Sequence, residues 1–352
     1  MHRYAFEPLK KATKPLKIAI TGADGYSGRY MTELLLQDKN ITEIRNLTQK
    51  LEKSKSNSSI PIQTNFPLNF DTDNKKTSSL EKSLEGIDTF ICTYWMRYGF
   101  DAGLCPALER VKSLTDAAKN AGVKKMIYVS HTQPKINTDI GYIKAKAQAE
   151  QYISQEFSDL EFAFVRPCLL FGDSPSESIV ANNTAYLLRK MPVMMFPGDI
   201  KKVHFQPVHV RDLAQMAVNL AVSEQKVQGF IDAVGPEKFT FHEFISLYPK
   251  FLNLSLPRIL LSTHLPASMI YQLTKPINFL LNDLYIEKGD LKILEQNLAC
   301  SESDQVEGQR YWGTRRFSDW LDENKEQIGK EYVNSFQRYY GVDGKRDVFS
   351  FN

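Results

Sequence analysis

Short apolar runs alternate with segments of helical periodicity through the first half of the chain. The runs are typical of buried strands, whereas apolar residues three and four positions apart form one face of a helix. Strands are predicted in this way at residues 17–20, 41–47, 68–70, 89–92, 125–130 and 161–165. Helices are predicted at residues 30–35, 80–84, 111–121 and 142–157. Residues 51–66 are polar and predict a loop.

Strands that alternate with helices indicate an α/β fold with a doubly wound parallel sheet and right-handed crossovers. In such sheets ligands bind at the carboxyl ends of the strands. Four segments that are distant in sequence follow strand ends, and they begin near Gly22, Cys92, Ser130 and Arg166. We therefore expect these four segments to converge on one cleft.

The second half of the chain is less regular. A helix is predicted over residues 213–222, a strand over 230–234 and a final helix over 317–340. Thr240 is expected to cap a further helix, with Glu243 three residues on as its capping-box partner. Residues 265–281 are strongly apolar, and they indicate a helix pair that covers the substrate pocket or the core or, alternatively, a surface for a membrane or a protein partner.

A glycine-rich loop separates the first predicted strand from the first predicted helix. It reads Thr21-Gly22-Ala23-Asp24-Gly25-Tyr26-Ser27-Gly28. Glycines at this spacing allow a tight turn, a close approach of the backbone to a pyrophosphate and close packing of helix on strand. The loop predicts a Rossmann-type domain that binds an NAD(P) dinucleotide. The expected contacts come from Thr21, Gly22, Gly25, Tyr26, Ser27 and Gly28.

The end of the second predicted strand bears on the choice of dinucleotide. An acid there would bind the ribose of NAD, but the sequence is Arg45-Asn46-Leu47-Thr48-Gln49-Lys50. Arg45 and Lys50 favour the 2′-phosphate of NADP, with NAD as the alternative if both are ordinary surface cations. Asp71, after the third predicted strand, is expected to contact the adenine or to cap the following turn.

Tyr142 and Lys146 are four positions apart, so a helix would place both side chains on one face. A lysine cation beside a phenol lowers the pKa of the phenol, which can then exchange a proton while a nicotinamide moves a hydride. Lys146 could also hold the nicotinamide ribose. Ser130 or Thr132, with His131 as a further alternative, is expected to bind a substrate carbonyl. A packed tyrosine beside a solvated lysine is the competing interpretation.

Two other strand ends contribute expected cofactor contacts. Residues 93–98 combine two tyrosines, a tryptophan, a methionine and an arginine, which would form a pocket wall or, alternatively, aromatic core. Thr93 and Tyr94 are the expected cofactor contacts from this segment, and Pro167 is the expected contact after the sixth strand.

Composition narrows the choice of partners and compartment. The chain has 352 residues, and a net charge of +3 gives no reason to expect nucleic acid as a partner. No apolar stretch approaches the roughly 20 residues that span a bilayer. The four cysteines form no CxxC pair, and His204 and His209 lack a third ligand, so no metal site is predicted. We expect a cytoplasmic protein, with a mitochondrial presequence at residues 1–16 as the alternative.

The later motifs complete a family pattern. Arg166-Pro167 is followed by Phe171-Gly172, and residues 206–214 and 232–241 read QPVHVRDLA and DAVGPEKFTF. With the glycine loop and the Tyr142–Lys146 pair, these resemble the extended and atypical short-chain dehydrogenase/reductases, in particular NmrA-like and complex-I accessory-subunit-like proteins. The resemblance covers residues 17–250. It implies a Rossmann domain, NAD(P) binding and a small C-terminal substrate region, and it assigns roles to the three glycines, Tyr142, Lys146 and Ser130.

The predicted organisation is a tail at residues 1–16, an NAD(P)-binding domain at 17–170 and a mostly helical substrate or partner region at 171–352 that interleaves with the sheet. We expect an NADP(H)-dependent oxidoreductase or epimerase-like enzyme for a small carbonyl, hydroxyl or nucleotide-sugar substrate. A non-catalytic redox sensor or an accessory or assembly subunit is the alternative. It stays open because Tyr142 follows Ser130 by only twelve positions.

Overall fold

The computed structural model describes most of the chain, in two compact units. The described residues are 2–3, 9–48, 61–70, 77–95, 106–191, 193–254, 259–263, 265–283, 286–302, 313–335 and 337. Unit 1 comprises the described residues of Met1–Pro167 and Val210–Ala233, together with Gly313. Unit 2 comprises those of Cys168–His209, Val234–Glu302 and Thr314–Asn352.

Unit 1 contains an eight-stranded sheet in the order β1-β12-β7-β6-β5-β2-β3-β4, and neighbouring strands pair in parallel. Its central strands β2 and β5 are buried at every position except Lys17, because helices cover both faces of the sheet. The predicted doubly wound α/β fold is confirmed. The strands are β1 (His2–Arg3), β2 (Leu16–Thr21), β3 (Ile41–Thr48), β4 (Ile62–Pro67), β5 (Thr89–Cys92), β6 (Lys125–Val129), β7 (Glu161–Pro167) and β12 (Gln228–Ala233).

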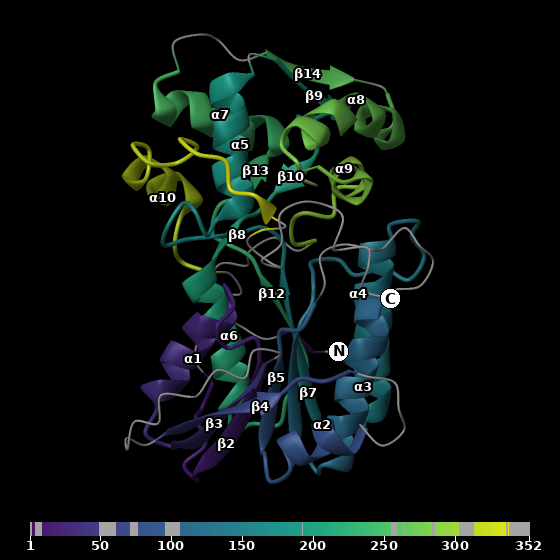
Figure 1. Cartoon of the computed structure of the whole chain (residues 1–352), viewed down its shortest axis with the longest axis vertical. Helices are drawn as coiled ribbons and strands as arrows, with labels where there is room; N and C mark the ends of the chain where they lie inside the picture. Colours follow the sequence, from purple (N-terminus) through teal and green to yellow (C-terminus); the bar gives the residue numbers. More distant parts are fainter. Residues whose placement is uncertain are drawn as a thin grey trace. The chain divides into compact units, whose positions relative to one another are not determined.

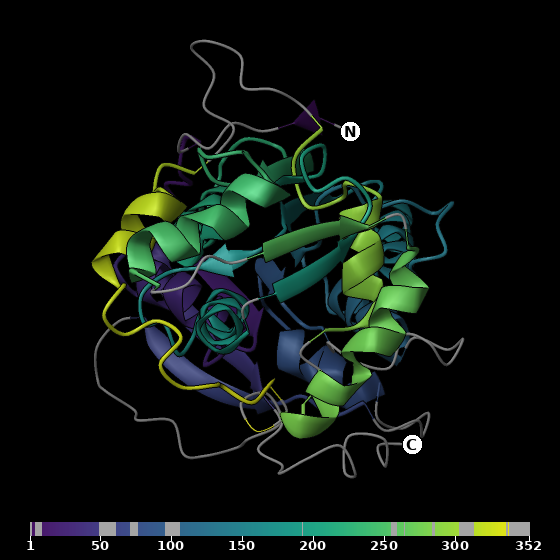
Figure 2. The same ribbon diagram turned by 90° about the horizontal axis from the view of Figure 1, so that it is seen from above.

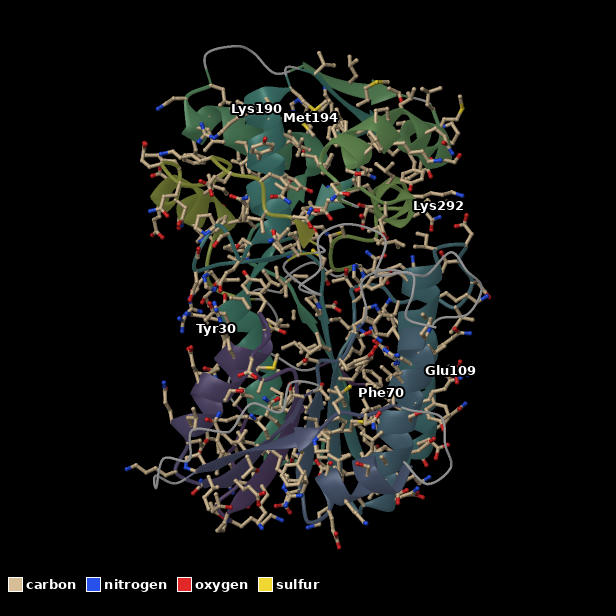
Figure 3. The ribbon with its side chains drawn as sticks, viewed as in Figure 1. Tyr30, Phe70, Glu109, Lys190, Met194 and Lys292 are labelled. Carbon is tan, nitrogen blue, oxygen red and sulfur yellow. The ribbon has the colours of Figure 1, made fainter. Side chains whose placement is uncertain are left out.

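Two groups of helices cover the faces of this sheet (Figure 1). Helices α1 (Gly28–Leu36) and α6 (Val210–Ala221) pack together on one face. Helices α2 (Thr77–Leu84), α3 (Pro106–Asn120) and α4 (Gly141–Glu156) pack side by side on the other. A core of buried aliphatic and aromatic side chains fills the second interface. In Figure 3, Tyr30 of α1 and Phe70 accordingly lie on opposite faces of the sheet.

The strand order reverses between β2 and β5. From β2 the chain proceeds outward to β3 and β4, and it then returns to β5 and continues in the other direction to β6, β7 and β12. The helices that follow β2 and β5, which are α1 and α3, therefore pack on opposite faces of the sheet. Such a switch point is the usual ligand site of an open α/β sheet.

The third predicted strand was misplaced. Residues 68–70 are not a strand, and the strand that pairs with β3 is β4, within the region predicted as a loop. β4 lies at the edge of the sheet, where its side chains are exposed or half-buried, so its sequence shows no apolar run. Residues 51–60 of the predicted loop lie outside the described residues. At the other edge, β1 from the predicted tail pairs with β12.

Unit 2 is built from short strands and helices around an aromatic core. Figure 2 shows strands β9 and β14 side by side, with α8 and α9 to one side of them. Phe171 lies at the centre of the core, 5.1 Å from Phe317 and 5.5 Å from Trp320 between ring centroids. The elements are β8 (Leu170–Phe171), α5 (Ile179–Lys190), β9 (Val193–Pro197), β10 (His204–Phe205), β11 (Val208–His209), β13 (Phe239–Thr240), α7 (Phe241–Leu252), β14 (Ile259–Thr263), α8 (Ala267–Leu280), α9 (Lys288–Glu295) and α10 (Phe317–Glu323).

Three predictions for this unit have different outcomes. The capping box of α7 is confirmed, because Thr240 N–H donates to Glu243 Oε2 at 2.8 Å and Glu243 N–H donates to Thr240 Oγ1 at 3.2 Å. The apolar segment 265–281 forms the single helix α8 with Pro276 inside it, and not a helix pair. The final helix, predicted to reach residue 340, ends at Glu323, and the chain turns at Gly329 with a φ of +70°.

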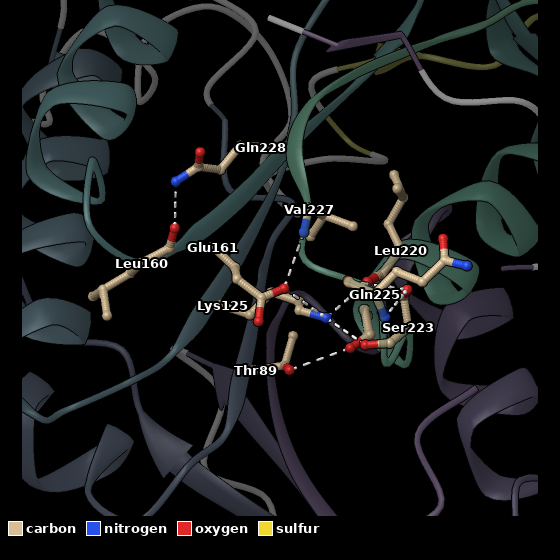
Figure 4. Close-up of polar contacts among 10 residues, drawn as sticks. Thr89, Lys125, Leu160, Glu161, Leu220, Ser223, Gln225, Val227 and Gln228 are labelled. Carbon is tan, nitrogen blue, oxygen red and sulfur yellow. Dashed lines mark hydrogen bonds and ion pairs between the residues drawn. The ribbon is translucent and has the colours of Figure 1, made fainter. Parts of the chain in front are cut away.

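A buried lysine joins three elements at the amino-terminal edge of the sheet of unit 1 (Figure 4). Lys125 Nζ donates to the carbonyl oxygen of Ser223 at 2.7 Å and lies 3.2 Å from Glu161 Oε2. The same carboxylate oxygen accepts from Val227 N–H at 3.1 Å. Burial lowers the pKa of Lys125, and the nearby Glu161 partly offsets this effect. The lysine thus ties the end of α6 to β6 and β7.

Replacing Lys125 with methionine should lower the free energy of unfolding by about 2 kcal/mol, because a carbonyl and a carboxylate lose their donor while the apolar stem is kept. Urea denaturation followed by circular dichroism measures this loss. Lys124→Met is the matched control, since the pair of Lys124 with Asp88 is at the surface and contributes under about 1 kcal/mol. Equal losses in the two variants would contradict the structural role of Lys125.

Candidate functional site

The glycine loop closes on itself between β2 and α1. Gly22 has a φ of +67°, in the left-handed region, and its carbonyl oxygen accepts from Gly25 N–H at 2.9 Å. A Cβ atom on Gly28 would lie 2.0 Å from that carbonyl oxygen, far inside van der Waals contact. The conformation of the loop therefore favours glycine at position 22 and requires it at position 28.

The amino-terminal end of α1 can receive an anion. Its N-cap residue Ser27 makes no side-chain capping hydrogen bond, and the first turn contains no acidic residue. Gly22 and Gly25 are exposed, and Tyr26 and Ser27 are half-buried. Backbone N–H groups and the helix dipole at such an end favour phosphate groups. The close-packed glycines and the uncapped helix end together fit a dinucleotide diphosphate.

The end of β5 is bonded to the start of this loop. Thr93 N–H donates to Thr21 Oγ1 at 2.9 Å, and Thr93 Oγ1 donates to the carbonyl oxygen of Thr21 at 2.5 Å. The next residue, Tyr94, accepts from Arg110 Nη1 at 2.9 Å, and its ring lies 4.9 Å from that of Phe70. The two segments at the strand-order switch, after β2 and after β5, are therefore fixed to each other.

Arg45, the residue predicted to bind a 2′-phosphate, is bonded to protein groups in the structure. Its Nε donates to Glu43 Oε1 at 2.5 Å, and its Nη1 donates to the carbonyl oxygen of Glu85 at 2.7 Å. The guanidinium also lies over the ring of Phe66, 4.9 Å from the ring centroid. The side chain thus packs between β4 and the end of α2, and the arrangement gives no support to a role in binding the dinucleotide.

The neighbouring residue, Asn46, contacts the glycine loop instead. It is buried, and its side chain bonds to Ala23 N–H and to the carboxylate of Asp24. Sequence reasoning did not single it out, because an asparagine at a strand end has no distinctive spacing. The one available signal was its position, where Rossmann domains commonly carry the residue that contacts the adenosine ribose.

Tyr142 and Lys146 lie one turn apart on α4, with Lys146 Nζ 6.0 Å from the centroid of the Tyr142 ring. Lys146 is buried. Its ammonium donates to Tyr128 Oη at 3.1 Å and to the carbonyl oxygen of Val129 at 2.8 Å. It also lies 3.8 Å from the centroid of the Trp95 ring, in cation–π contact. The lysine cation is therefore held at the carboxyl end of β6, within an aromatic group that includes Tyr142.

The half-buried ring of Tyr142 stands between two other rings. It is edge-to-face with Trp95, at 5.8 Å between centroids, and with His131, at 5.3 Å. Ser130 Oγ is buried and has no hydrogen-bond partner among the described residues. Thr132 is fully buried, and its N–H donates to the carbonyl oxygen of Pro167 at 2.9 Å. The ends of β5, β6 and β7 therefore contribute polar and aromatic groups to the same region as Tyr142.

His131 is neutral at physiological pH. Burial is the main cause that lowers its pKa from 6.5 to about 4, and the cation of Lys146 lowers it further. Its Nδ1 lies 2.6 Å from the carbonyl oxygen of Thr132, so Nδ1–H donates there and Nε2 carries the lone pair. The imidazole can accept a hydrogen bond beside Tyr142 but carries no charge.

The depressed pKa of His131 makes stability pH-dependent. Below pH 6.5 the unfolded chain binds a proton that the folded chain excludes until about pH 4. The free energy of unfolding should therefore fall by about 2 kcal/mol between pH 7 and pH 5. Urea denaturation at the two pH values measures this, with His131→Gln as the control that should lose most of the dependence. An unchanged dependence in that variant would assign it to other groups.

Some predicted positions cannot be placed. Asp71 and Lys50 lie outside the described residues.

Within the part of the chain that the structure describes, no three His, Cys, Asp or Glu side chains are grouped to hold a metal ion. None of the described helices has both the length and the apolar character needed to cross a membrane.

Comparison with known families and sequences identifies proteins that resemble this chain. Residues 22–189 match the family model described as NAD(P)H-binding. The chloroplastic divinyl chlorophyllide a 8-vinyl-reductase of Arabidopsis thaliana is 22% identical over 237 residues, which are 65% of this chain and 55% of that protein. The mitochondrial NADH dehydrogenase [ubiquinone] 1 alpha subcomplex subunit 9 of Rattus norvegicus is 24% identical over 156 residues, 43% of this chain and 40% of that protein. The chain thus spans about half the length of these relatives or less.

Solved structures share the fold. The NADPH-dependent quinone oxidoreductase of Escherichia coli, complexed with NADPH, matches with a TM-score of 0.63 over 87% of this chain and 99% of that chain. The two sequences are 16% identical, a level at which the likeness shows the fold alone.

Proposed function

We propose that this chain is an NADP(H)-dependent oxidoreductase or epimerase-like enzyme, because residues 22–189 match the family model described as NAD(P)H-binding. Its substrate would be a small carbonyl or hydroxyl compound or a nucleotide sugar. The observation that carries the proposal is the fit of Gly28 against the Gly22 carbonyl, which builds a close-packed loop at an uncapped helix end. NADP(H) is favoured over NAD(H) because the quinone oxidoreductase with this fold carries NADPH.

The described residues would have separate roles in binding and in proton transfer. The N–H groups of the glycine loop would bind the diphosphate. Thr93, which is bonded to Thr21, holds the end of β5 next to this loop. A bound nicotinamide would supply or accept the hydride. Tyr142 gives or takes the proton at the substrate oxygen. Ser130, Thr132 or His131 donates to or accepts from the same substrate, and the buried Oγ of Ser130 is available for this bond.

Lys146 would act mainly through its charge. Its ammonium is bonded to Tyr128 and Val129, so the cation is fixed 6.0 Å from the Tyr142 ring and not in the solvent. A fixed cation at this distance favours the phenolate form of Tyr142 and any negative charge that develops on the substrate. Aromatic walls from Trp95 and Tyr142 suit a flat carbonyl compound, and this places quinones among the first substrates to test.

Calorimetric titration with NADPH and NADH tests the proposal first, because binding precedes any turnover. Oxidation of the reduced dinucleotide is then followed at 340 nm against quinones, aldehydes, ketones and nucleotide sugars. We expect micromolar affinity for at least one dinucleotide and turnover with one substrate class. Absence of binding to both dinucleotides would contradict the proposal as a whole.

A non-catalytic accessory or assembly subunit is the second candidate, and one observation in unit 2 favours it. Helix α8 exposes large apolar side chains, with Phe279 80% and Leu280 81% accessible. The rat relative is by name a subunit of a mitochondrial complex. This candidate predicts dinucleotide binding without turnover and a stable protein partner that a Phe279→Ser, Leu280→Ser variant no longer retains. It also predicts a mitochondrial location in place of a cytoplasmic one, which cell fractionation tests.

A further inference from the structure

Asn46 occupies an unusual place in a dinucleotide-binding unit. It lies near the carboxyl end of β3 and is 5% exposed. An acid at this point commonly binds the ribose of the dinucleotide, but this chain has an amide there. The side chain is directed at the glycine loop and at β4 and makes three hydrogen bonds.

Both the oxygen and the nitrogen of the Asn46 side-chain amide are hydrogen-bonded to the glycine loop. Its Oδ1 accepts from Ala23 N–H at 3.2 Å, and its Nδ2 donates to Asp24 Oδ2 at 3.0 Å. Nδ2 also donates to Asn65 Oδ1, at 3.3 Å, on the neighbouring strand. This position needs an acceptor and a donor on one short side chain. Asparagine supplies both, whereas aspartate cannot donate and leucine can do neither.

The bonded carboxylate belongs to the loop itself. Asp24 is exposed and lies between Gly22 and Gly25, so a negative charge is built into the segment expected to receive a diphosphate. The hydrogen bond to Asn46 ties that carboxylate to the end of β3. It also fixes the loop backbone on either side of Ala23, which lowers the cost of ordering the loop when an anion binds.

We propose that Asn46 is a positioning residue for dinucleotide binding: through Ala23 and Asp24 it holds the glycine loop in its binding conformation. The inference rests on the proposed function. It adds a residue that does not contact the reacting groups. Because the diphosphate is common to both dinucleotides, the loss of this bonding affects NADH and NADPH equally.

The test exchanges the two partners. Asn46→Asp places a carboxylate beside that of Asp24 and removes the donor, so both dinucleotides bind about tenfold more weakly or worse. The double variant Asn46→Asp, Asp24→Asn restores one donor and one acceptor with their positions reversed, and affinity returns to within about threefold of the natural protein. Asn120→Asp is the matched control, because Asn120 Nδ2 also donates to a carboxylate, that of Glu81. This bond joins α3 to α2, on the face of the sheet opposite α1. It leaves affinity unchanged.

A second pair of variants keeps the test decisive if Asn46→Asp does not fold. Asp24 is exposed, so its variants fold. Removing its charge would by itself strengthen binding of an anion. Asp24→Asn keeps an acceptor for Asn46 and binds at least as tightly as the natural protein. Asp24→Ala loses the acceptor and binds more weakly, by about threefold or more, despite the lost charge.

The outcomes separate this inference from the proposed function. Calorimetry on the natural protein that finds neither NADH nor NADPH binding overturns both. Binding by the natural protein together with unchanged affinity in Asn46→Asp, or tighter binding in Asp24→Ala, overturns the positioning role alone. Unequal losses for NADH and NADPH in Asp24→Ala also overturn it, because this variant places no acid at the ribose and the loss of the loop bond alone has to affect both dinucleotides alike.

Discussion

Replacing Gly28 with alanine is expected to lower the affinity for NADPH or NADH by at least about 100-fold. The new methyl carbon would lie 2.0 Å from the Gly22 carbonyl oxygen and 2.8 Å from its carbonyl carbon. Both atoms belong to the backbone, so no side-chain rotation relieves the overlap. The loop has to open, and its N–H groups then no longer converge on one anion.

Two other glycines calibrate this result in the same calorimetric titration. A Cβ on Gly289 would meet nothing within 4 Å, so Gly289→Ala should bind as the natural protein does. A Cβ on Gly25 would lie 3.1 Å from the Gly22 carbonyl oxygen, and a small shift accommodates it, so Gly25→Ala should fall between the two. Natural affinity in Gly28→Ala would show that the dinucleotide binds elsewhere.

The glycine loop could be predicted from sequence because its chemistry is encoded in residue type. Gly22 has a positive φ, which glycine adopts without strain, and Gly28 needs the absence of a side chain, which only glycine provides. The central strands were predictable for a related reason. A strand covered on both faces is rich in apolar residues, and β2 and β5 contain the runs Ile18-Ala19-Ile20 and Phe90-Ile91-Cys92.

The edge of the sheet was not predictable in this way. β4 pairs with β3 through its backbone, while its side chains stay exposed or half-buried. Backbone hydrogen bonds place little demand on residue type, so a strand of this kind can have the polar sequence IQTNFP. The apolar residues just after it, Leu68 and Phe70, drew the prediction to the wrong place.

The contrast between Arg45 and Asn46 shows a second limit. Successive side chains on a strand point to opposite faces of the sheet, so only one of two neighbours can reach the glycine loop. Charge made Arg45 the natural candidate for a phosphate contact. In the structure, the Arg45 side chain bonds to Glu43 and to the carbonyl oxygen of Glu85 after α2, whereas the Asn46 side chain bonds to the glycine loop. Which face each residue takes depends on the register of β3, and a single sequence does not reveal it.

The Tyr142–Lys146 pair was predicted as far as helical spacing allows. Both residues do lie on α4, one turn apart. Lys146 bonds to Tyr128 and Val129 of β6 and contacts Trp95 in the segment after β5, and none of these residues is on α4. This tertiary packing determines whether the ammonium of Lys146 bonds to the Tyr142 hydroxyl or acts on it only through its electric field. Helical spacing alone does not predict which of the two occurs.

The proposed proton transfer makes Tyr142→Phe the most damaging change for turnover. With the substrate found by the panel, kcat should fall by about 100-fold or more, because the phenylalanine ring keeps the packing against Trp95 and His131 but has no proton to exchange. Dinucleotide affinity should stay within about twofold. Stopped-flow measurement of a single turnover, with binding by calorimetry, separates the two effects.

Tyr152 supplies the matched control on the same helix. Its hydroxyl donates to Asp116 Oδ1 at 2.6 Å, on the side of α4 that faces α3, so Tyr152→Phe removes an equivalent oxygen from outside the site. Its kcat should equal that of the natural protein. Equal rates in both variants would remove Tyr142 from the reaction and leave the buried Ser130 hydroxyl and the neutral imidazole of His131 as the groups near the substrate. If neither variant nor the natural protein turns over any substrate while all three bind the dinucleotide, the aromatic group around Lys146 is a structural lining, and the accessory-subunit function is favoured.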